Sequence, residues 1–177
     1  KIEFKQNSYE DGENSIISFP EFLLLVLDVC TGGEQPASHY QPDKLIEKFD
    51  ALKTHFTAGE FYEKMLYYRL LLDYYTIRRD IKDGQGNYSL ILKGPKDDND
   101  KLKQYQSMLY VSTEAFYNWL KPYLRKLEQD ELQSCAEMLA FLKKEDNERH
   151  GVLPARKDLS YKASGNIRYW FWRLDYY

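Results

Sequence analysis

Histidine and cysteine are scarce in this chain of 177 residues. The histidines are His39, His55 and His150; none lies within helical reach of another, and no Cys-x-x-Cys pair or cysteine–histidine cluster occurs. Protein zinc sites are normally built from such clusters. We therefore expect no bound metal and no cofactor. The two cysteines, Cys30 and Cys135, are expected to be buried free thiols in a reducing compartment.

An excess of basic residues and a long apolar run are also missing. The formal net charge is −3, whereas a generic nucleic-acid binder is basic overall. A membrane-spanning helix needs about 20 consecutive apolar residues, and no run reaches that length; no signal peptide is visible either. We therefore expect a cytoplasmic protein without a membrane partner. Because the chain begins at Lys1 rather than at Met, we expect a piece excised from a longer protein.

Motifs for catalysis are not found in the sequence. Cys30 has no base at a recognised spacing. The glycine-containing turn at residues 84–86 does not stand between a good strand and a helix, as a phosphate-binding loop does. The acidic pairs at 97–98 and at Glu145 and Asp146 lie in polar runs that are typical of solvated faces. We therefore expect no catalytic residue and no enzymatic activity in this chain.

Aromatic residues and helical periodicity, in contrast, are abundant. Hydrophobic residues make up 43% of the chain and aromatic residues 16%, with 16 tyrosines, which favours broad amphipathic packing surfaces. The longest periodic segment, residues 61–81, is apolar and aromatic almost all the way round. Thr57 and Glu60 before it form a Thr-x-x-Glu capping box. Since a helix of this kind is normally buried among other helices, we place it at the centre of the fold.

The remaining pattern predicts a mainly α protein. Ser18 and Glu21 form a second capping box, before a helix that runs to about Cys30. Residues 88–92 form a short β-like run. We expect an irregular multi-helix bundle with at most a small β-hairpin around residues 77–92. We also expect a single domain over residues 1–177, with helical halves at 18–81 and 99–177.

Charged residues inside the apolar segment are the first candidate site. Arg69 and Asp73 stand four positions apart, which places them on one face of a helix. Ions on a mostly buried helix need partners. The sequence therefore predicts a buried ion pair with a structural role. An anion-binding site at Arg69, Arg78 or Arg79 is the alternative.

The tail of the chain is the second candidate. Residues 166–177 read NIRYWFWRLDYY, which predicts a short helix with too many aromatic residues for one stripe. Basic residues interleaved with aromatics can hold nucleic acid by charge and stacking. Such a tail can instead pack into its own domain, onto the next domain, or against a second copy. The residues expected to make the nucleic-acid or domain contact are Arg168, Tyr169, Trp170, Trp172 and Arg173.

Four stretches, taken in order, resemble one protein family. They are SFPEFLL at 18–24, YRLLLDYY at 68–75 followed by IRR at 77–79, QSMLYVS at 106–112, and YWFWRLDY at 169–176. Together they resemble the helical middle region of GmrSD-type restriction proteins. Proteins of that family join a ParB/sulfiredoxin-like nuclease domain to a C-terminal HNH-type nuclease domain.

The resemblance implies that both nuclease centres lie outside this chain. The family's amino-terminal motif, Asp-Gly-Gln-Gln-Arg after a strand, is matched only in its first three residues by Asp83, Gly84 and Gln85, and those lie downstream of the expected central helix. The His of the HNH motif would lie beyond Tyr176. The resemblance therefore implies a non-catalytic scaffold, linker or sensor in a bacterial phage-defence protein.

Its implied partners are the neighbouring nuclease domains of a parent endonuclease, with direct DNA contact left open. The alternative is a stand-alone module that binds nucleic acid or protein through its basic, aromatic tail.

Overall fold

Helices dominate the computed structural model of this chain, which describes residues 13–82, 87–95, 99–112, 114–152 and 164–176. The turn at 84–86 and the acidic pair at 97–98 lie outside the described residues. Within them the chain forms seven α-helices and three short strands. The prediction of a mainly α fold is confirmed.

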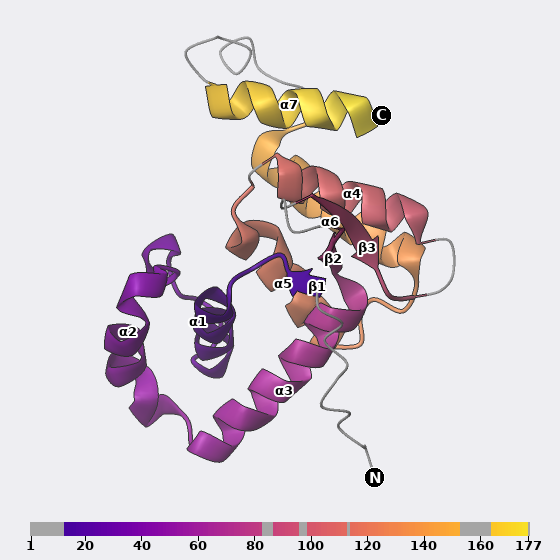
Figure 1. Cartoon of the computed structure of the whole chain (residues 1–177). Coiled ribbons are helices and arrows are strands. Elements are labelled where there is room, and N and C mark those ends of the chain that lie inside the picture. The colour runs from indigo at the N-terminus through magenta and orange to yellow at the C-terminus, as the bar shows by residue number, and fades with distance from the viewer. Residues whose placement is uncertain (1–12, 83–86, 96–98, 113, 153–163, 177) are drawn as a thin grey trace.

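The elements follow one another as Figure 1 shows. The first half contains β1 (Glu13–Ser15), α1 (Phe19–Cys30), α2 (Leu45–Leu52), α3 (Ala58–Tyr75), β2 (Ile77–Ile81) and β3 (Tyr88–Leu92). The second half contains α4 (Asp100–Val111), α5 (Phe116–Glu128), α6 (Cys135–His150) and α7 (Ser164–Tyr176). Three 3-10 turns, η1 (Ala37–His39), η2 (Pro42–Lys44) and η3 (Lys53–His55), lie around α2.

Helix α1 occupies the centre of the first half. Its start is the predicted capping box, in which the Ser18 amide donates to Glu21 at 2.7 Å and the Glu21 amide donates to Ser18 Oγ at 3.4 Å. The side chains from Leu24 to Leu27 are completely buried. Figure 1 shows α1 inside the arc formed by α2 and α3, and it contacts both. The unbroken apolar run of α1 therefore forms the middle of this half.

Helix α3 is only half-covered, so the prediction that it is buried among other helices at the centre of the fold is wrong. Phe61, Tyr68, Leu71 and Leu72 are buried against the core. The opposite side of the helix exposes five large apolar residues, which are Tyr62, Leu66, Tyr67, Leu70 and Tyr74. The reason is position: α3 packs on α1 and α5 from the outside.

Helix α3 also ends earlier than its periodicity predicts. The expected helix over 61–81 stops at Tyr75, and Thr76 is extended. The Thr76 hydroxyl donates to the Leu72 carbonyl at 2.6 Å, and the Ile77 amide donates to Gln106 Oε1 of α4 at 2.9 Å. Thr76 and Ile77 are both β-branched, and such residues favour a strand over a helix, which explains the change at this point.

The strands form a three-stranded antiparallel sheet in the order β1-β2-β3. Ile77 pairs with Leu92 and Ile81 with Tyr88, which confirms the predicted small β-hairpin around residues 77–92. Strand β1 adds to its free edge through pairs such as Ser15 with Arg78. The sheet therefore joins the start of the described chain to the segment between the two helical halves.

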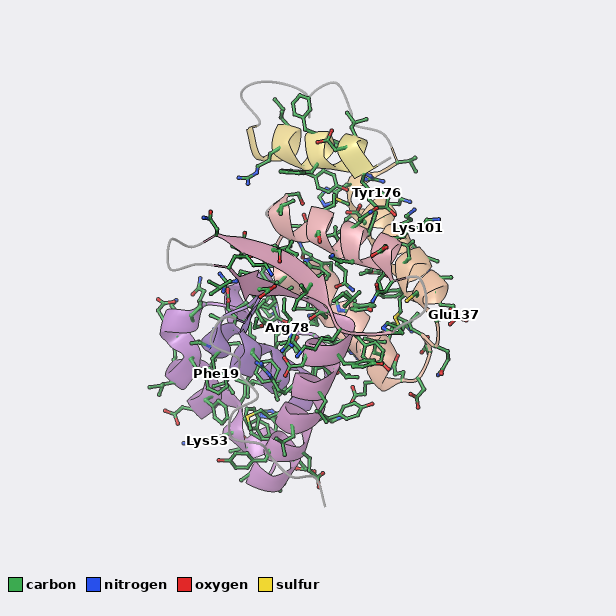
Figure 2. All side chains as sticks on the ribbon, turned by 45° about the vertical axis from the view of Figure 1, so that its right-hand side comes forward. Phe19, Lys53, Arg78, Lys101, Glu137 and Tyr176 are labelled. Atoms are coloured by element: carbon green, nitrogen blue, oxygen red, sulfur yellow. The ribbon has the colours of Figure 1, made fainter. Side chains whose placement is uncertain are left out.

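The second half packs α4, α5, α6 and α7 together. Its fully buried side chains include Leu102, Tyr105, Leu109, Trp119, Leu120, Tyr123 and Leu124. Figures 1 and 2 both show α7 lying beside α4, which it contacts, and Figure 2 labels Tyr176 near the end of α7. In the described part of the chain, no helix combines the length and apolar character that a membrane crossing needs. Neither Cys30 nor Cys135 is in a disulfide; Cys135 is buried as expected, whereas Cys30 is only half-buried.

Candidate interaction surface

Helix α7 has a buried side and an exposed aromatic side. Tyr169 and Trp170 are each 5% exposed. On the other side Phe171 is 65% exposed, Trp172 41% and Leu174 65%. Residues three or four positions apart share a helix face, so Phe171 and Leu174 lie together on the outer side. The twelve-residue aromatic tail therefore divides into an anchor and an outward patch, which we call the α7 patch and define as Phe171, Trp172 and Leu174.

The anchor is built around one buried carboxylate, Asp146 of α6. The Tyr105 hydroxyl of α4 donates to Asp146 Oδ2 at 2.7 Å. The Tyr169 hydroxyl of α7 donates to the same carboxylate at 2.8 Å. Asp146 is 1% exposed. One acidic side chain therefore joins three helices, which fixes α7 on the α4–α6 pair.

Arg173 supplies the matching positive charge. Its Nη1 lies 3.7 Å from Asp146 Oδ2 and donates to the Gly151 carbonyl at 2.9 Å and to the Tyr169 hydroxyl at 2.7 Å. Its Cζ lies 5.0 Å from the centre of the Trp170 ring, a distance at which a guanidinium is attracted to an aromatic face. The charge of Arg173 is therefore satisfied inside the domain.

The ionisation of this cluster follows from its burial. Burial, with the Asp146 carboxylate beside them, raises the pKa of the Tyr105 and Tyr169 hydroxyls far above the ordinary tyrosine value. Burial lowers the pKa of Arg173, but Tyr169 and Asp146 outweigh burial and raise it overall. The phenols therefore stay neutral donors and the guanidinium stays charged, which keeps the anchor intact at physiological pH.

A groove lies between α4 and the outer edge of α7. Its volume is about 410 Å³. Met108, Val111 and Trp172 give it apolar walls, and polar groups stand along its rim. The whole lining consists of Lys103, Gln104, Ser107, Met108, Val111, Trp172, Asp175 and Tyr176. The α7 patch is thus continuous, through Trp172, with a partly apolar depression.

The structure separates the five tail residues that the sequence grouped together. Tyr169, Trp170 and Arg173 face the core and contact Asp146 or each other. Only Arg168 and Trp172 of that set are exposed. The expected contact set is corrected accordingly: its buried members hold α7 in place, and the exposed patch includes Phe171 and Leu174, which lie outside that set.

Arg69 and Asp73 lie together on the edge of α3. Arg69 Nε lies 2.8 Å from Asp73 Oδ2, with side-chain exposures of 26% and 30%. They are half-buried rather than buried, because the outer side of α3 is open. Arg78 Nη1 reaches Asp73 Oδ1 from β2 at 3.5 Å. The carboxylate therefore links the helix to the sheet.

Arg78 and Arg79 are successive residues of β2, and each has a partner within the fold. Successive strand residues point to opposite faces of a sheet. Arg78 is buried and lies near the middle of the molecule in Figure 2, where its guanidinium faces Asp73. Arg79 Nη2 donates to the Ser15 carbonyl of β1 at 3.1 Å. Both guanidinium groups are thus engaged within the fold.

Asp146 is the residue whose importance the sequence hid most completely. It stands in the charged run of α6, where the sequence predicts a solvated face for Glu145 and Asp146 alike. That prediction is wrong for Asp146, which is buried. A helical wheel offers the missing signal, because Asp146 follows the buried Met138 and Leu142 at four-residue steps.

Across the described ranges, no three or more histidine, cysteine or acidic side chains gather closely enough to hold a metal ion. Comparison of the chain with protein-family models, with curated proteins and with solved structures finds no match. The site must therefore be interpreted from its own geometry.

Proposed function

We propose that this chain is a non-catalytic helical module that docks a neighbouring protein domain on the α7 patch. The proposed role is that of the interdomain scaffold or sensor in a bacterial GmrSD-like restriction protein. The observation that carries the proposal is the division of α7, in which Arg173 is locked onto Asp146 while Phe171, Trp172 and Leu174 face outward.

The fixed position of α7 on the rest of the protein favours the binding of a partner domain. A surface that is already rigid loses little conformational entropy when a partner binds. The inner side of α7 is fixed by hydrogen bonds from Tyr169 and Arg173 to partners on α6 and just beyond it. Tryptophan and other aromatic side chains are enriched at the centres of protein interfaces. The exposed Phe171 and Trp172 are therefore well placed to act as anchors for a partner.

The charge distribution favours a protein partner over nucleic acid. Arg173 is buried and paired with Asp146, so it does not contribute to the surface. The exposed charged residues of α7 that flank the α7 patch are Arg168 and Asp175, which have opposite signs. Nucleic-acid binding without sequence preference needs a positively charged path for the phosphates. The net charge of −3 works against such a path. Domain docking is the simpler use of the outward aromatics.

The resemblance supplies the identity of the proposed partner. In GmrSD-type proteins an HNH-type nuclease domain follows the helical middle region, and an outward aromatic patch on the last described helix suits contact with such a domain. The proposed module positions or senses for its neighbours and does not itself cut DNA.

The test begins with the reading frame that encodes the chain. If the frame carries an Asp-Gly-Gln-Gln-Arg motif upstream and an HNH motif downstream, the downstream domain is expressed separately and titrated against the chain. The expected result is binding that Phe171→Ser and Leu174→Ser each weaken at least tenfold, about 1.4 kcal/mol. Ile46→Ser, which changes an even more exposed apolar residue on α2, is the matched control and should bind normally.

Two results would overturn the proposal. One is a frame that lacks both motifs. The other is binding that the α7 variants leave unchanged. Titration with a fluorescent single-stranded oligonucleotide at low and high salt addresses the alternative function, because nucleic-acid affinity falls steeply as salt rises. Salt-dependent binding that Trp172→Ala abolishes would establish a stand-alone nucleic-acid module instead.

A further inference from the structure

The outer side of α3 is a second exposed surface, distinct from the α7 patch. Four of its residues, Tyr62, Leu66, Leu70 and Tyr74, follow one another at four-residue steps. They are 60%, 54%, 66% and 44% exposed in that order. Residues four positions apart are neighbours on a helix surface. They form one continuous stripe, which we call the α3 stripe, along most of the helix.

The α3 stripe has the same residue types when it is followed in either direction. Its midpoint is Tyr68, with Leu66 and Leu70 at equal steps on the two sides. Tyr62 and Tyr74 are likewise equidistant from Tyr68, as are two acidic residues, Glu63 and Asp73. The order Tyr-acid-Leu before the midpoint thus becomes Leu-acid-Tyr after it. A two-fold rotation that makes two such helices antiparallel places each residue beside the residue at the same distance on the other side of the midpoint. The surface is therefore complementary to a second copy of itself.

We propose that two copies of this chain associate through their α3 stripes, with the helices antiparallel and a two-fold axis between them, at the level of Tyr68 along each helix. Leu66 of each copy then faces Leu70 of the other at the centre. At about 100° per residue, Tyr62 and Asp73 lie on one edge of the stripe, and Glu63 and Tyr74 lie on the other.

The edges of the stripe are complementary as well. In the antiparallel dimer, each edge of the stripe lies beside the same edge of the second copy, and the two edges run in opposite directions. The hydroxyl of Tyr62 therefore comes beside Asp73 of the second copy, and the hydroxyl of Tyr74 comes beside Glu63. A hydrogen bond from a neutral phenol to a carboxylate is among the stronger kinds. Each tyrosine tip meets an acceptor while its ring covers the leucines.

The backbone of α3 is already fixed for such a contact. On its inner side, the Tyr68 hydroxyl donates to Glu128 Oε2 of α5 at 2.7 Å, and Lys64 pairs with the same carboxylate. On its edge, Asp73 is held by Arg69 at 2.8 Å. Association therefore needs little reordering of the helix, and it covers an apolar surface of the kind that usually marks an interaction site.

The first test is the mass of the intact chain in solution, measured by sedimentation equilibrium over a range of concentrations. The expected result is twice the chain mass at high concentration. Leu66→Glu and Leu70→Glu place like charges at the centre of the interface and should give the single-chain mass. Ile46→Glu, on an exposed position of α2, is the matched control and should remain dimeric. Circular dichroism shows that each variant is folded.

The second test fixes the register. Leu66→Cys chains and Leu70→Cys chains are mixed and oxidised, since a disulfide requires Cβ atoms within about 3.5–4.5 Å. The expected main product joins one chain of each kind, and either chain alone should cross-link less. The unaltered chain controls for the native Cys30.

Three results would overturn the inference: a single-chain mass at every concentration, a dimer that survives Leu66→Glu, or equal cross-linking in all mixtures. The outcome is independent of the proposed function. Phe171→Ser should leave the α3 dimer unchanged, and Leu66→Glu should leave domain docking at α7 unchanged. A dimer that is lost on Phe171→Ser would assign self-association to α7 instead.

Discussion

Arg173 Nη1 lies 3.7 Å from Asp146 Oδ2, and the two side chains are only 2% and 1% exposed. This pair joins the last described helix, α7, to α6 inside the protein. Two tyrosine hydroxyls complete the coordination of the carboxylate. The position of the α7 patch therefore depends on a single buried acid in the middle of a charged stretch of α6.

Asp146→Asn should destabilise the fold strongly. The substitution removes the negative charge and leaves Arg173 buried without its compensating ion, which typically costs about 3–5 kcal/mol. Urea unfolding, followed by tryptophan fluorescence, measures the change. Since Trp170 is buried under α7, its emission should also shift to longer wavelength if α7 separates from α4.

Glu148→Gln is the control for this substitution. Glu148 lies on the same helix, and its side chain is 60% exposed beside Lys144. Exposed pairs of this kind contribute about 0–1 kcal/mol. Equal unfolding midpoints for the two variants would show that the Asp146 cluster does not hold α7.

Asp73→Asn should have a smaller effect than Asp146→Asn. Asp73 is 30% exposed, but it holds Arg69 at 2.8 Å and faces the buried Arg78 at 3.5 Å. We expect a loss of about 1–2 kcal/mol, between the values for surface pairs and for hydrogen bonds to charged groups. Asp50→Asn, in an exposed pair with Lys53, should cost nearly nothing. A urea denaturation series that ranks Asp50 with Asp73 would contradict the expectation.

Local signals predicted much of the fold. The capping boxes at Ser18 and Thr57 locate the starts of α1 and α3, because the side-chain oxygen satisfies an amide that no helical carbonyl can reach. The β-like run over Tyr88–Leu92 is strand β3. These features depend on neighbours within a few residues, so the sequence alone contains the information.

Features that depend on tertiary position could not be predicted in the same way. The apolar circumference of α3 indicates a buried helix, yet burial depends on whether another element lies on each side. Asp146 and Glu145 are adjacent acids in one polar run, and only the packing of α4 and α7 distinguishes them. The exposure of Phe171 and the burial of Arg173 likewise depend on which side of α7 packs against α4 and α6.

Acid should weaken the link between α5 and α6 at Glu114. Asn118 donates to Glu114 Oε1 at 2.8 Å, His150 Nε2 lies 3.1 Å from Oε2, and Arg149 Nε lies 3.9 Å away. Burial raises the pKa of this carboxyl, but the hydrogen bonds from His150 and Asn118 outweigh burial and hold the pKa below its usual value.

The sign of the pH effect follows from that lowered pKa. In the unfolded chain, a glutamate carboxyl such as Glu114 binds its proton near pH 4.3. In the folded chain, Glu114 binds that proton only at lower pH. The stabilisation from Glu114 is therefore fully present above the unfolded pKa and is lost as the pH falls through the folded pKa. Urea midpoints between pH 3 and 6 should fall less steeply for Glu114→Gln than for the unaltered chain. Glu47→Gln, exposed on α2, should keep the original slope.

Gly94 controls the packing of Tyr74 at the end of the α3 stripe. The Gly94 amide donates to the Tyr74 carbonyl at 3.0 Å. A Cβ atom at Gly94 would overlap the Tyr74 ring, because the two lie in direct contact. The absence of a side chain at Gly94 thus allows the loop after β3 to close over the end of α3.

Gly94→Ala should therefore displace the Tyr74 ring and destabilise the fold. Inserting a methyl group into a close contact typically costs about 1–3 kcal/mol, which urea unfolding would detect. Gly59→Ala is the matched control, since Gly59 lies in the first turn of α3 with open space for a Cβ beyond ordinary contact with Thr57. Alanine is favoured over glycine in helices by about 0.5–1 kcal/mol, so this control should be neutral or stabilising.

If Tyr74 also covers Leu66 and Leu70 of a second copy, Gly94→Ala should lower the dimer fraction while Gly59→Ala leaves it unchanged. A Gly94→Ala variant as stable as the unaltered chain would contradict the close packing of this loop on Tyr74.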